Sequence, residues 1–305
     1  MTITFRPGWR PTPPERPRVR MDAALDETAA PAAANFYTGV RAGMLGNDAY
    51  GDCVFAGDGH IVEQQTFYGQ GSEVTVSTAQ ALAAYSAVTG FNQNDPSTDQ
   101  GAVIADGLSY LRKTGMAGHK IAAYGEVSVS AMGKVQLATA EFGAVSIGIN
   151  LPNSAMDQFS NGQPWDVVPR DGGIDGGHCV IVCGYDPAYL SVFTWGTVQK
   201  MTYAFWDKYV EEAWPVVSAD WVSAAKGVDP EGVSLEVLGQ QFSSVTGQPS
   251  PFPAPAPVPA DPDQAFAAVL EAQNAAGQAW ATQRHSGYVT KVAKAAQVWL
   301  AAKGL

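Results

Sequence analysis

A cysteine and a histidine, far apart in the sequence, are the residues of this chain whose surroundings best fit covalent chemistry. Cys53 stands between a glycine–aspartate turn and the apolar residues 54–56. His178 follows two glycines and opens the apolar run 179–185. A thiol and an imidazole that are distant in sequence but adjacent in the fold form the pair used in nucleophilic acyl transfer. The sequence therefore favours a cysteine nucleophile with a histidine base.

The residues around Cys53 predict how the thiol is held. Asp52 suits a helix N-cap position, which predicts a helix from Cys53 to about Phe67. The unpaired N–H groups and the dipole at a helix N-terminus stabilise an anion and lower the pKa of a thiol. The charge of Asp52 opposes this effect unless its carboxylate accepts hydrogen bonds from the same helix end. We expect Cys53 to be a reactive nucleophile at the start of this helix.

Strand alternation separates His178 from the two later cysteines. In an extended run from His178, the side chains of Cys179 and Cys183 point to the opposite face from the imidazole. We expect both cysteines to be core residues, and we expect no metal site, because these three groups cannot converge on one ion. No cofactor motif is present. The remaining histidines are expected to be structural or surface residues: His60, His119 and His285.

The order of predicted elements indicates the fold class. Ser77 and Gln80 form a capping-box pattern before a helix over 81–88, with Gly90 as its stop. Further helices are predicted over 102–113, capped by Asp99, and over 130–142, 203–212, 219–225 and 233–242. Strands are predicted over 144–149, 178–185 and 190–194. Helices come first and strands later within one unit, which is typical of the α+β class.

Composition divides the chain into four segments. Residues 1–35 form an extended arm rich in proline and arginine, and residues 36–245 form one domain. Residues 246–262 are a proline-rich linker, and residues 263–305 are an alanine-rich helical tail. The arm is too short and too rich in proline to resemble an inhibitory pro-segment. It is either a solvated tail or a basic segment that docks onto an acidic partner.

Bulk properties exclude several classes of function. The 305 residues carry a net charge of −11, which argues against nucleic-acid binding. The first twenty residues lack the apolar stretch of a signal peptide, and no apolar window is long enough to span a membrane. Three cysteines are too few for a disulfide scaffold and favour a reducing compartment. We expect no nucleic-acid partner and no membrane association.

Three segments in order resemble the papain-like cysteine peptidases. Asn47 lies six residues before Cys53, where that superfamily places a glutamine that helps form the oxyanion hole. The run from Gly176 to Asp186 resembles the strand that carries the catalytic histidine. The segment Phe193-Thr194-Trp195-Gly196 resembles the Asn-Ser-Trp-Gly segment of that superfamily. The resemblance spans residues 46 to about 196.

This resemblance implies a papain-like fold, with the cysteine in an N-terminal helical half and His178 in a C-terminal antiparallel half. It implies that Asn47 supplies an oxyanion donor. The family's orienting asparagine corresponds to Phe193, which cannot accept from an imidazole, so either Thr194 or a backbone carbonyl must orient His178. Trp195 resembles the indole that shields the histidine, although plain core packing also explains it.

The pattern Leu-Gly-Asn-Asp…Tyr-Gly-Asp-Cys over residues 45–53 resembles a divergent group of such proteins found in phages and prophages of high-GC bacteria. We therefore expect a phage-encoded cysteine peptidase that acts on a peptide or isopeptide, located in the host cytoplasm or on the virion. The alternative is a virion structural or attachment protein with a peptidase-like scaffold, whose arm and tail bind other virion proteins. A cell-wall amidase that cleaves peptide stems shares the same pair of residues.

Overall fold

The structure is a computed structural model that describes residues 6–221, except 17, 23–24 and 26–29, together with residues 243 and 249–250. The predicted helix over 233–242 and the predicted tail over 263–305 lie outside the described residues. Nearly all of the predicted linker over 246–262 does so as well. Within the described part of the chain, no helix has both the length and the apolar character needed to cross a bilayer.

A seven-stranded sheet forms the C-terminal half. Its strands follow the order β4-β9-β5-β6-β7-β8, and β2 pairs with β6 outside this path. All of these pairings are antiparallel. The bounds are β2 (Ala34–Asn35), β4 (Ile121–Tyr124), β5 (Val145–Pro152), β6 (Ile174–Tyr185), β7 (Tyr189–Thr194), β8 (Thr197–Thr202) and β9 (Val210–Ser218).

Helices flank this sheet, and a second, parallel pair of short strands lies beside it, formed by β1 and β3. The strand bounds are Trp9–Arg10 and Ala102–Val103. The α-helices are α1 (Cys53–Gln65), α2 (Thr78–Thr89), α3 (Ile104–Lys113), α4 (Met132–Phe142), α5 (Asn153–Ser160) and α6 (Tyr203–Tyr209). Shorter elements are η2 (Thr66–Gln70), η3 (Pro96–Thr98) and η4 (Ala219–Trp221).

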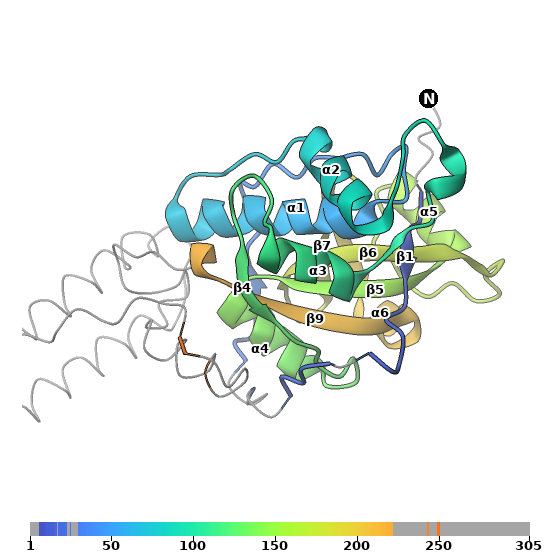
Figure 1. The fold of residues 1–305 in the computed structure, drawn as a ribbon. Coiled ribbons are helices and arrows are strands. Elements are labelled where there is room, and N and C mark those ends of the chain that lie inside the picture. Colours follow the sequence, from blue (N-terminus) through green and yellow to red (C-terminus); the bar gives the residue numbers. More distant parts are fainter. Residues whose placement is uncertain are drawn as a thin grey trace, which may run out of the picture.

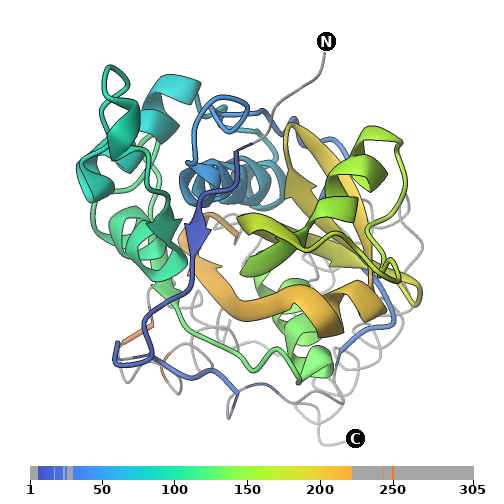
Figure 2. The ribbon, with the colours of Figure 1, turned by 90° about the vertical axis from the view of Figure 1, so that its right-hand side faces the viewer.

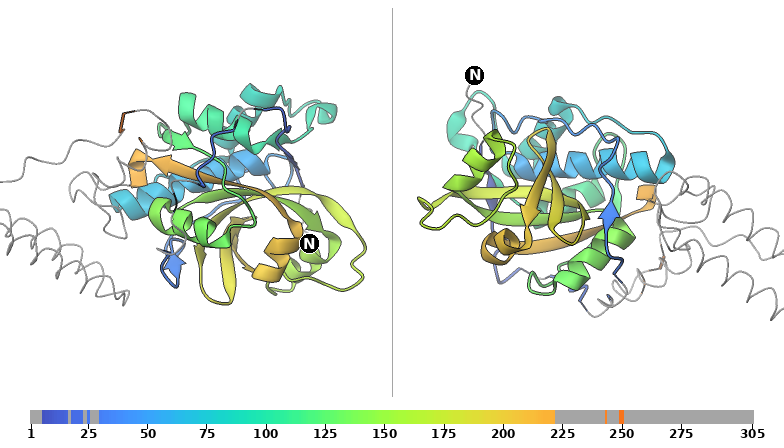
Figure 3. Two further views of the ribbon diagram at one scale, coloured as in Figure 1. Left: turned by 90° about the horizontal axis from the view of Figure 1, so that it is seen from below. Right: turned by 180° about the vertical axis from the view of Figure 1, so that it is seen from behind.

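The sheet separates two layers of helix. Helix α1 runs along one face of the sheet with α2 and α3 on its outer side, and α4 covers the other face (Figure 1). Views from below and from behind show the same arrangement (Figure 3). The side chains of β6 alternate between the two cores, with Cys179 in the core beneath α1 and Val180 in the core beside α4. One strand therefore contributes to both halves of the molecule.

Helix α1 is buried along its whole length, because it lies between the sheet and the outer helices. Gly57 lets it approach β6: a Cβ atom at this position would lie 3.0 Å from Cδ1 of Ile181. Glycine weakens a helix by about 1 kcal/mol relative to alanine, so packing against the sheet offsets the low propensity. The side-chain amides of Gln64 and Gln65 bond to the carbonyls of Gly143 and Phe142 and fix the far end of the helix.

The predicted α+β class is confirmed, with helices in the N-terminal half and an antiparallel sheet in the C-terminal half. The capping box is present, since Ser77 and Gln80 exchange both hydrogen bonds and Gly90 ends α2 with a positive φ. The prediction for Asp99 is wrong. Helix α3 is preceded by Val103, and the Asp99 carboxylate instead contacts the loop before Cys53.

Asp58 places a carboxyl group in the interior of α1. Burial raises its pKa well above the ordinary value, and its Oδ2 atom has no hydrogen-bond partner. A group whose pKa is raised by folding lowers stability as pH rises above the unfolded value of about 4. We expect Asp58→Asn to raise the free energy of unfolding at pH 7 by roughly 1–2 kcal/mol.

Chemical denaturation at pH 7 and at pH 4 measures this effect. The gain is expected to shrink at the lower pH, because the unfolded carboxyl is then protonated as well. Asp157→Asn on the exposed side of α5 is the control and is expected to change stability by less than about 0.5 kcal/mol. A gain that is the same at both pH values would contradict the assignment of a buried, neutral Asp58.

Candidate active site

The nucleophile candidate Cys53 is the first residue of α1. Asp52 is the N-cap residue, but its side chain makes no capping hydrogen bond. The preceding turn needs left-handed backbone at Leu45 and Gly46, where φ is 53° and 110°. Cys53 Sγ accepts a hydrogen bond from the backbone N–H of Cys179, at 3.4 Å. The thiol therefore lies against β6, beside the residue that follows His178.

Burial sets the protonation state of the Cys53 thiol. Cys53 is only 1% exposed, and this desolvation raises its pKa to about 12, with the neighbouring Asp52 carboxyl adding to the effect. The sequence-based expectation of a lowered pKa is wrong for this conformation. Removal of water from an anion outweighs the favourable dipole of the helix end. Asp52 is also buried, and its own pKa is raised well above the ordinary value, again by desolvation first.

His178 lies on β6 and is held from two sides. Its Nε2 atom lies 2.7 Å from Oγ1 of Thr194 on β7. The indole of Trp195 stacks on the imidazole, with ring centroids 4.4 Å apart and an interplanar angle of 18°. The other ring nitrogen, Nδ1, has no hydrogen-bond partner. Burial lowers the pKa of His178 to about 3, so the ring is neutral.

Thr194 and Trp195 reach His178 because β7 and β8 form a tight hairpin. Trp195 and Gly196 both have positive φ, at 44° and 74°, and Thr194 pairs with Thr197 across the turn. Two consecutive residues with positive φ are typical of a type I′ turn, for which glycine in the second position is well suited. Of the two orienting groups left open by the sequence, the Thr194 hydroxyl is the one at hydrogen-bond distance from the imidazole.

The predicted site residues meet around a small cavity of about 10 Å³, room for one water at most. Cys53, His178, Asn47 and Thr194 all line it. Cys53 and His178 make no hydrogen bond to each other in this conformation, since Nδ1 is unpartnered. The other lining residues are Met44, Ala56, Gly57, His60, Cys179, Phe193 and Trp195.

His60 also lines the cavity, although the sequence predicts only a structural or surface role for it. It lies two turns after Cys53 on α1, its Nε2 atom is 2.8 Å from the carbonyl oxygen of Gly43, and its ring is 5.8 Å from that of Phe193. Burial lowers its pKa to about 4. Seven residues from Cys53 is close to two helical turns, so helical spacing is the signal that places it on the same face.

The amide of Asn47 is already occupied. Its Nδ2 atom donates to the carbonyl oxygens of Tyr50, at 3.0 Å, and Arg6, at 3.1 Å. The first bond stays within the loop before Cys53. The second joins this loop to the N-terminal arm, which the sequence does not place near the site.

Strand β1 of the arm lies between the helical half and the sheet (Figure 2). The N–H of Gly8 donates to the carbonyl of Gly177, at 2.8 Å, and the N–H of Ala102 donates to the carbonyl of Gly8, at 2.7 Å. Residues 6–10 thus bridge the helical half and the sheet, and Gly8 is bonded to the residue that precedes His178.

Glycines allow this close approach. A Cβ atom at Gly8 would lie 1.9 Å from the carbonyl oxygen of Gly51, which is backbone and cannot rotate away. A Cβ atom at Gly101 or Gly177 would lie 2.0 Å or 2.1 Å from an arm carbonyl oxygen. The arm therefore fits only because these positions lack side chains, and Gly8→Ala cannot keep the arm in place.

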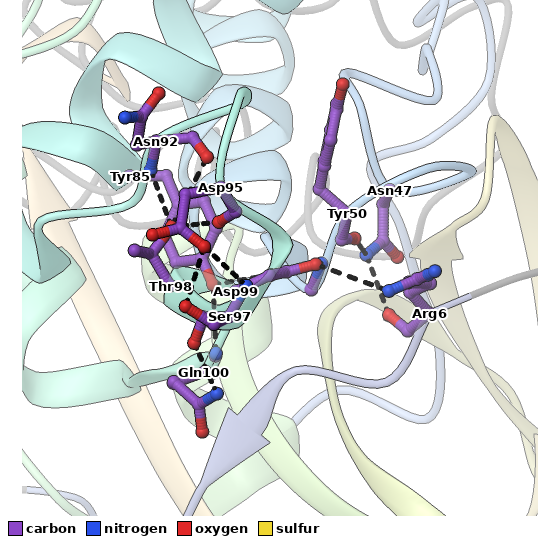
Figure 4. A network of polar contacts seen from close by, with 12 residues as sticks. Arg6, Asn47, Tyr50, Tyr85, Asn92, Asp95, Ser97, Thr98, Asp99 and Gln100 are labelled. Carbon is purple, nitrogen blue, oxygen red and sulfur yellow. Dashed lines mark hydrogen bonds and ion pairs between the residues drawn. The ribbon is translucent and has the colours of Figure 1, made fainter.

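Asp99 ties the arm to the loop before Cys53. Its carboxylate accepts from the N–H of Gly51, at 3.0 Å, and from the hydroxyl of Tyr85, at 2.8 Å. Arg6 of the arm lies 3.7 Å from the same carboxylate (Figure 4). The Tyr85 hydroxyl in turn accepts from the N–H of Gly101, beside the strand that pairs with the arm. Arm, loop and β3 share one polar network.

Within the described residues, no group of three or more histidine, cysteine, aspartate or glutamate side chains is arranged to hold a metal ion. His178 faces one core, and Cys179 and Cys183 face the other, as strand alternation predicts. The side chains that line the cavity offer a thiol, an imidazole and hydrogen-bond donors.

Comparisons with known proteins address the fold of the chain. No protein-family model matches the chain, and no curated protein matches its sequence. Among solved structures, xylellain, a cysteine protease from Xylella fastidiosa, is similar over 72% of this chain and 98% of its own, with 16% identity and a TM-score of 0.56. Two others have lower scores. The recombinant stem bromelain precursor has a TM-score of 0.49, with 14% identity over 71% of this chain and 78% of its own. The cysteine protease CMS1MS2 from Carica candamarcensis has a TM-score of 0.44, with 14% identity over 62% of this chain and 99% of its own. The likeness to xylellain shows that the described part of the chain has a papain-like fold.

Proposed function

We propose that this chain is a cysteine peptidase whose cleft is closed by its own N-terminal arm. Cys53 is the nucleophile and His178 the base, acting through Nδ1. The observation that carries the proposal is the state of the imidazole: Nε2 lies 2.7 Å from Thr194 Oγ1, while Nδ1 is unpartnered and the ring lines the same cavity as the thiol. An Nε2–H that donates to Thr194 leaves a lone pair on Nδ1, ready to take the thiol proton.

In the proposed reaction, the proton of Cys53 moves to Nδ1 of His178 as the sulfur attacks the carbonyl carbon of a peptide bond. The N–H of Cys53 and the amide of Asn47 stabilise the developing oxyanion. The imidazolium then protonates the leaving amine, and a thioester remains on Cys53. Water, deprotonated by His178, attacks this thioester and releases the acid with regeneration of the thiol.

The arm opposes each of these steps. The Arg6 carbonyl accepts from the Asn47 amide, which is the proposed oxyanion donor. Burial keeps the thiol protonated and the imidazole neutral in this closed conformation, with pKa values of about 12 and 3. Departure of residues 6–10 would free the Asn47 donor and admit water, which lowers the first pKa and raises the second.

A substitution at Thr194 tests the orienting role. Thr194→Val removes the acceptor and leaves a buried N–H unsatisfied, at a cost of about 1–3 kcal/mol. We expect kcat of the Gly8→Ala chain to fall about 10- to 100-fold with KM little changed, because the ring loses its productive tautomer. Thr194→Ser keeps the hydroxyl and is expected to retain most of the activity. Equal loss in both variants would argue for a packing role instead.

The substrate class we propose is a peptide or protein. A phage-encoded origin rests on the resemblance of residues 45–53, a virion role on the arm and tail as well, and a role on cell-wall peptides on the same Cys53 and His178 pair. The alternative, a virion scaffold without activity, is less favoured because it gives no reason for an imidazole with one oriented and one unpartnered nitrogen in a cavity shared with a thiol.

Hydrolysis of an unfolded protein substrate tests the proposal. The Gly8→Ala chain is compared with the same chain carrying Cys53→Ala, by gel and mass spectrometry. Cleavage that disappears with Cys53→Ala supports a peptidase. No cleavage of any protein or peptide by the arm-displaced chain, with its fold intact by circular dichroism, would favour the scaffold.

A further inference from the structure

Trp9 of the arm packs against the sheet at Gly148 and at Gly177, the residue before His178. Its side chain is buried, and its indole Nε1–H donates to Oε1 of Glu212 on β9, at 2.7 Å. Trp9 belongs to the same core as Cys53 and Cys179. The arm thus places one large aromatic side chain in the core that contains the thiol, with a defined polar partner for its single donor.

The shape of the pocket around the Trp9 indole comes from two glycines on neighbouring strands. A Cβ atom at Gly148 of β5 would lie 2.2 Å from Cε2, 2.4 Å from Cζ2 and 2.6 Å from Nε1 of the indole. A Cβ atom at Gly177 of β6 would lie 2.8 Å from Cε3. The flat ring therefore rests on bare backbone at both positions. Any side chain at Gly148 would fill the space that the indole occupies.

Glu212 supplies the polarity of the pocket. It lies directly across from Gly148 in the sheet and is 3% exposed, whereas its neighbour Glu211 is exposed. No ion pair to Glu212 is present among the described residues. A buried carboxylate is costly unless it accepts hydrogen bonds, so a partner with an N–H group is needed when the pocket is occupied. Trp9 provides that partner in the closed conformation.

We propose that the pocket formed by Gly148, Gly177 and Glu212, here called the indole pocket, recognises the substrate. It binds a tryptophan side chain of the peptide that replaces the arm. The inference rests on the proposed function and names a substrate feature for it. Trp9 is then a ligand in cis, and substrate competes with it for the same slot. A flat, side-chain-free floor selects an aromatic ring, and the single buried acceptor selects a ring with an N–H donor.

Binding of free indole to the full chain with Trp9→Ala tests the pocket without any need for activity. This variant vacates the slot, and calorimetry or ligand-observed NMR measures indole against 1-methylindole, which has the same shape but no N–H. We expect indole to bind about tenfold more tightly, the value of one hydrogen bond to a charged acceptor. The wild-type chain, with its slot filled, is expected to bind neither.

Substitutions at Glu212 test whether its side chain is the acceptor for the indole N–H. Adding Glu212→Met to Trp9→Ala is expected to abolish the preference for indole, and Glu212→Gln to retain it within about threefold, since an amide oxygen still accepts. Glu211→Gln is the matched control and should leave binding unchanged. Equal binding of indole and 1-methylindole, or tighter binding of phenylguanidine than of indole, would overturn the proposal.

Peptide selectivity provides a second measurement, which also covers failure of the Trp9→Ala chain to fold. In the full Gly8→Ala chain, whose arm is displaced, peptides that differ only in tryptophan, phenylalanine or arginine are compared by kcat/KM. Preference for tryptophan by about tenfold supports the pocket, and equal hydrolysis of all three overturns it while leaving the peptidase intact. Indole binding without hydrolysis of any peptide would instead support the pocket and count against the proposed activity.

Discussion

Replacing Gly8 by alanine is expected to raise the rate of Cys53 alkylation at pH 7 by at least about 100-fold. A methyl group at this position would meet the Gly51 carbonyl oxygen at 1.9 Å, so the arm must leave the cleft. With a pKa of about 12, roughly one thiol in 10⁵ is ionised at pH 7. An ordinary solvated cysteine, with a pKa near 8.5, is ionised to a few per cent. Only the thiolate reacts.

The rate of Cys53 alkylation should depend on pH in a defined direction. Because burial raises the pKa of Cys53 to about 12, alkylation of the wild-type chain should continue to accelerate as pH rises toward that value. Alkylation of Gly8→Ala should level off at a much lower pH. Iodoacetamide labelling followed by peptide mass spectrometry measures Cys53 separately from Cys179 and Cys183, which remain buried in the core.

Gly43→Ala is the matched control, because a Cβ atom there would make an ordinary contact of 3.5 Å with Leu45. Its alkylation rate should equal that of the wild type. Equal rates for Gly8→Ala and the wild type, with both chains folded, would show that the arm does not limit access to the thiol.

Replacing His178 by alanine in the Gly8→Ala chain is expected to lower kcat about 100- to 10,000-fold, the usual contribution of a general base. Burial holds the pKa of His178 near 3 in the closed chain, but solvent entry should raise it toward the ordinary value of about 6.5. The acid limb of the pH–rate profile should therefore follow His178 ionisation and should disappear in the alanine variant.

His119→Ala is the matched control for that experiment. This histidine pairs with Asp220, 2.8 Å away, and does not line the cavity of the thiol. Its removal should leave kcat and the pH profile unchanged. Added imidazole is expected to restore part of the activity of the His178 variant. A His178 variant that keeps full activity would contradict the assignment of the base.

Much of the site follows from local sequence. The turn before Cys53, the helix that it starts, and the strand that begins near His178 each depend on neighbouring residues, so the pattern of glycine, aspartate and apolar residues predicts them. Strand alternation also places Cys179 and Cys183 correctly, away from the imidazole. The Thr194 hydroxyl is one of the two orienting groups that the resemblance leaves open, and only the contact across the hairpin, at 2.7 Å, selects it.

The position of the arm does not follow from local pattern. Its contacts join Gly8 to Gly101 and Gly177, far along the chain, and they are formed by backbone atoms and by missing side chains. A Pro-Gly-Trp sequence in a proline-rich segment is typical of an ordinary turn. The pKa of Cys53 could not be predicted for the same reason, because its sign depends on whether the arm excludes water.

Asp99 shows a similar limit. Aspartate before an apolar run is a good helix cap by local criteria. In the structure its carboxylate is engaged by Gly51 and Tyr85, two long-range partners that no spacing rule identifies. The burial of Asp58 in α1 does not follow from local pattern either, because a polar residue in a helix usually faces solvent.

Covalent capture gives the most direct test of a Cys53 nucleophile paired with His178. The full Gly8→Ala chain is treated at pH 7 with a peptidyl vinyl sulfone, and the adduct is located by mass spectrometry. We predict one adduct, on Cys53, that forms far more slowly with His178→Ala. Modification of Cys179 or Cys183 instead, or no adduct on a folded chain, would contradict it.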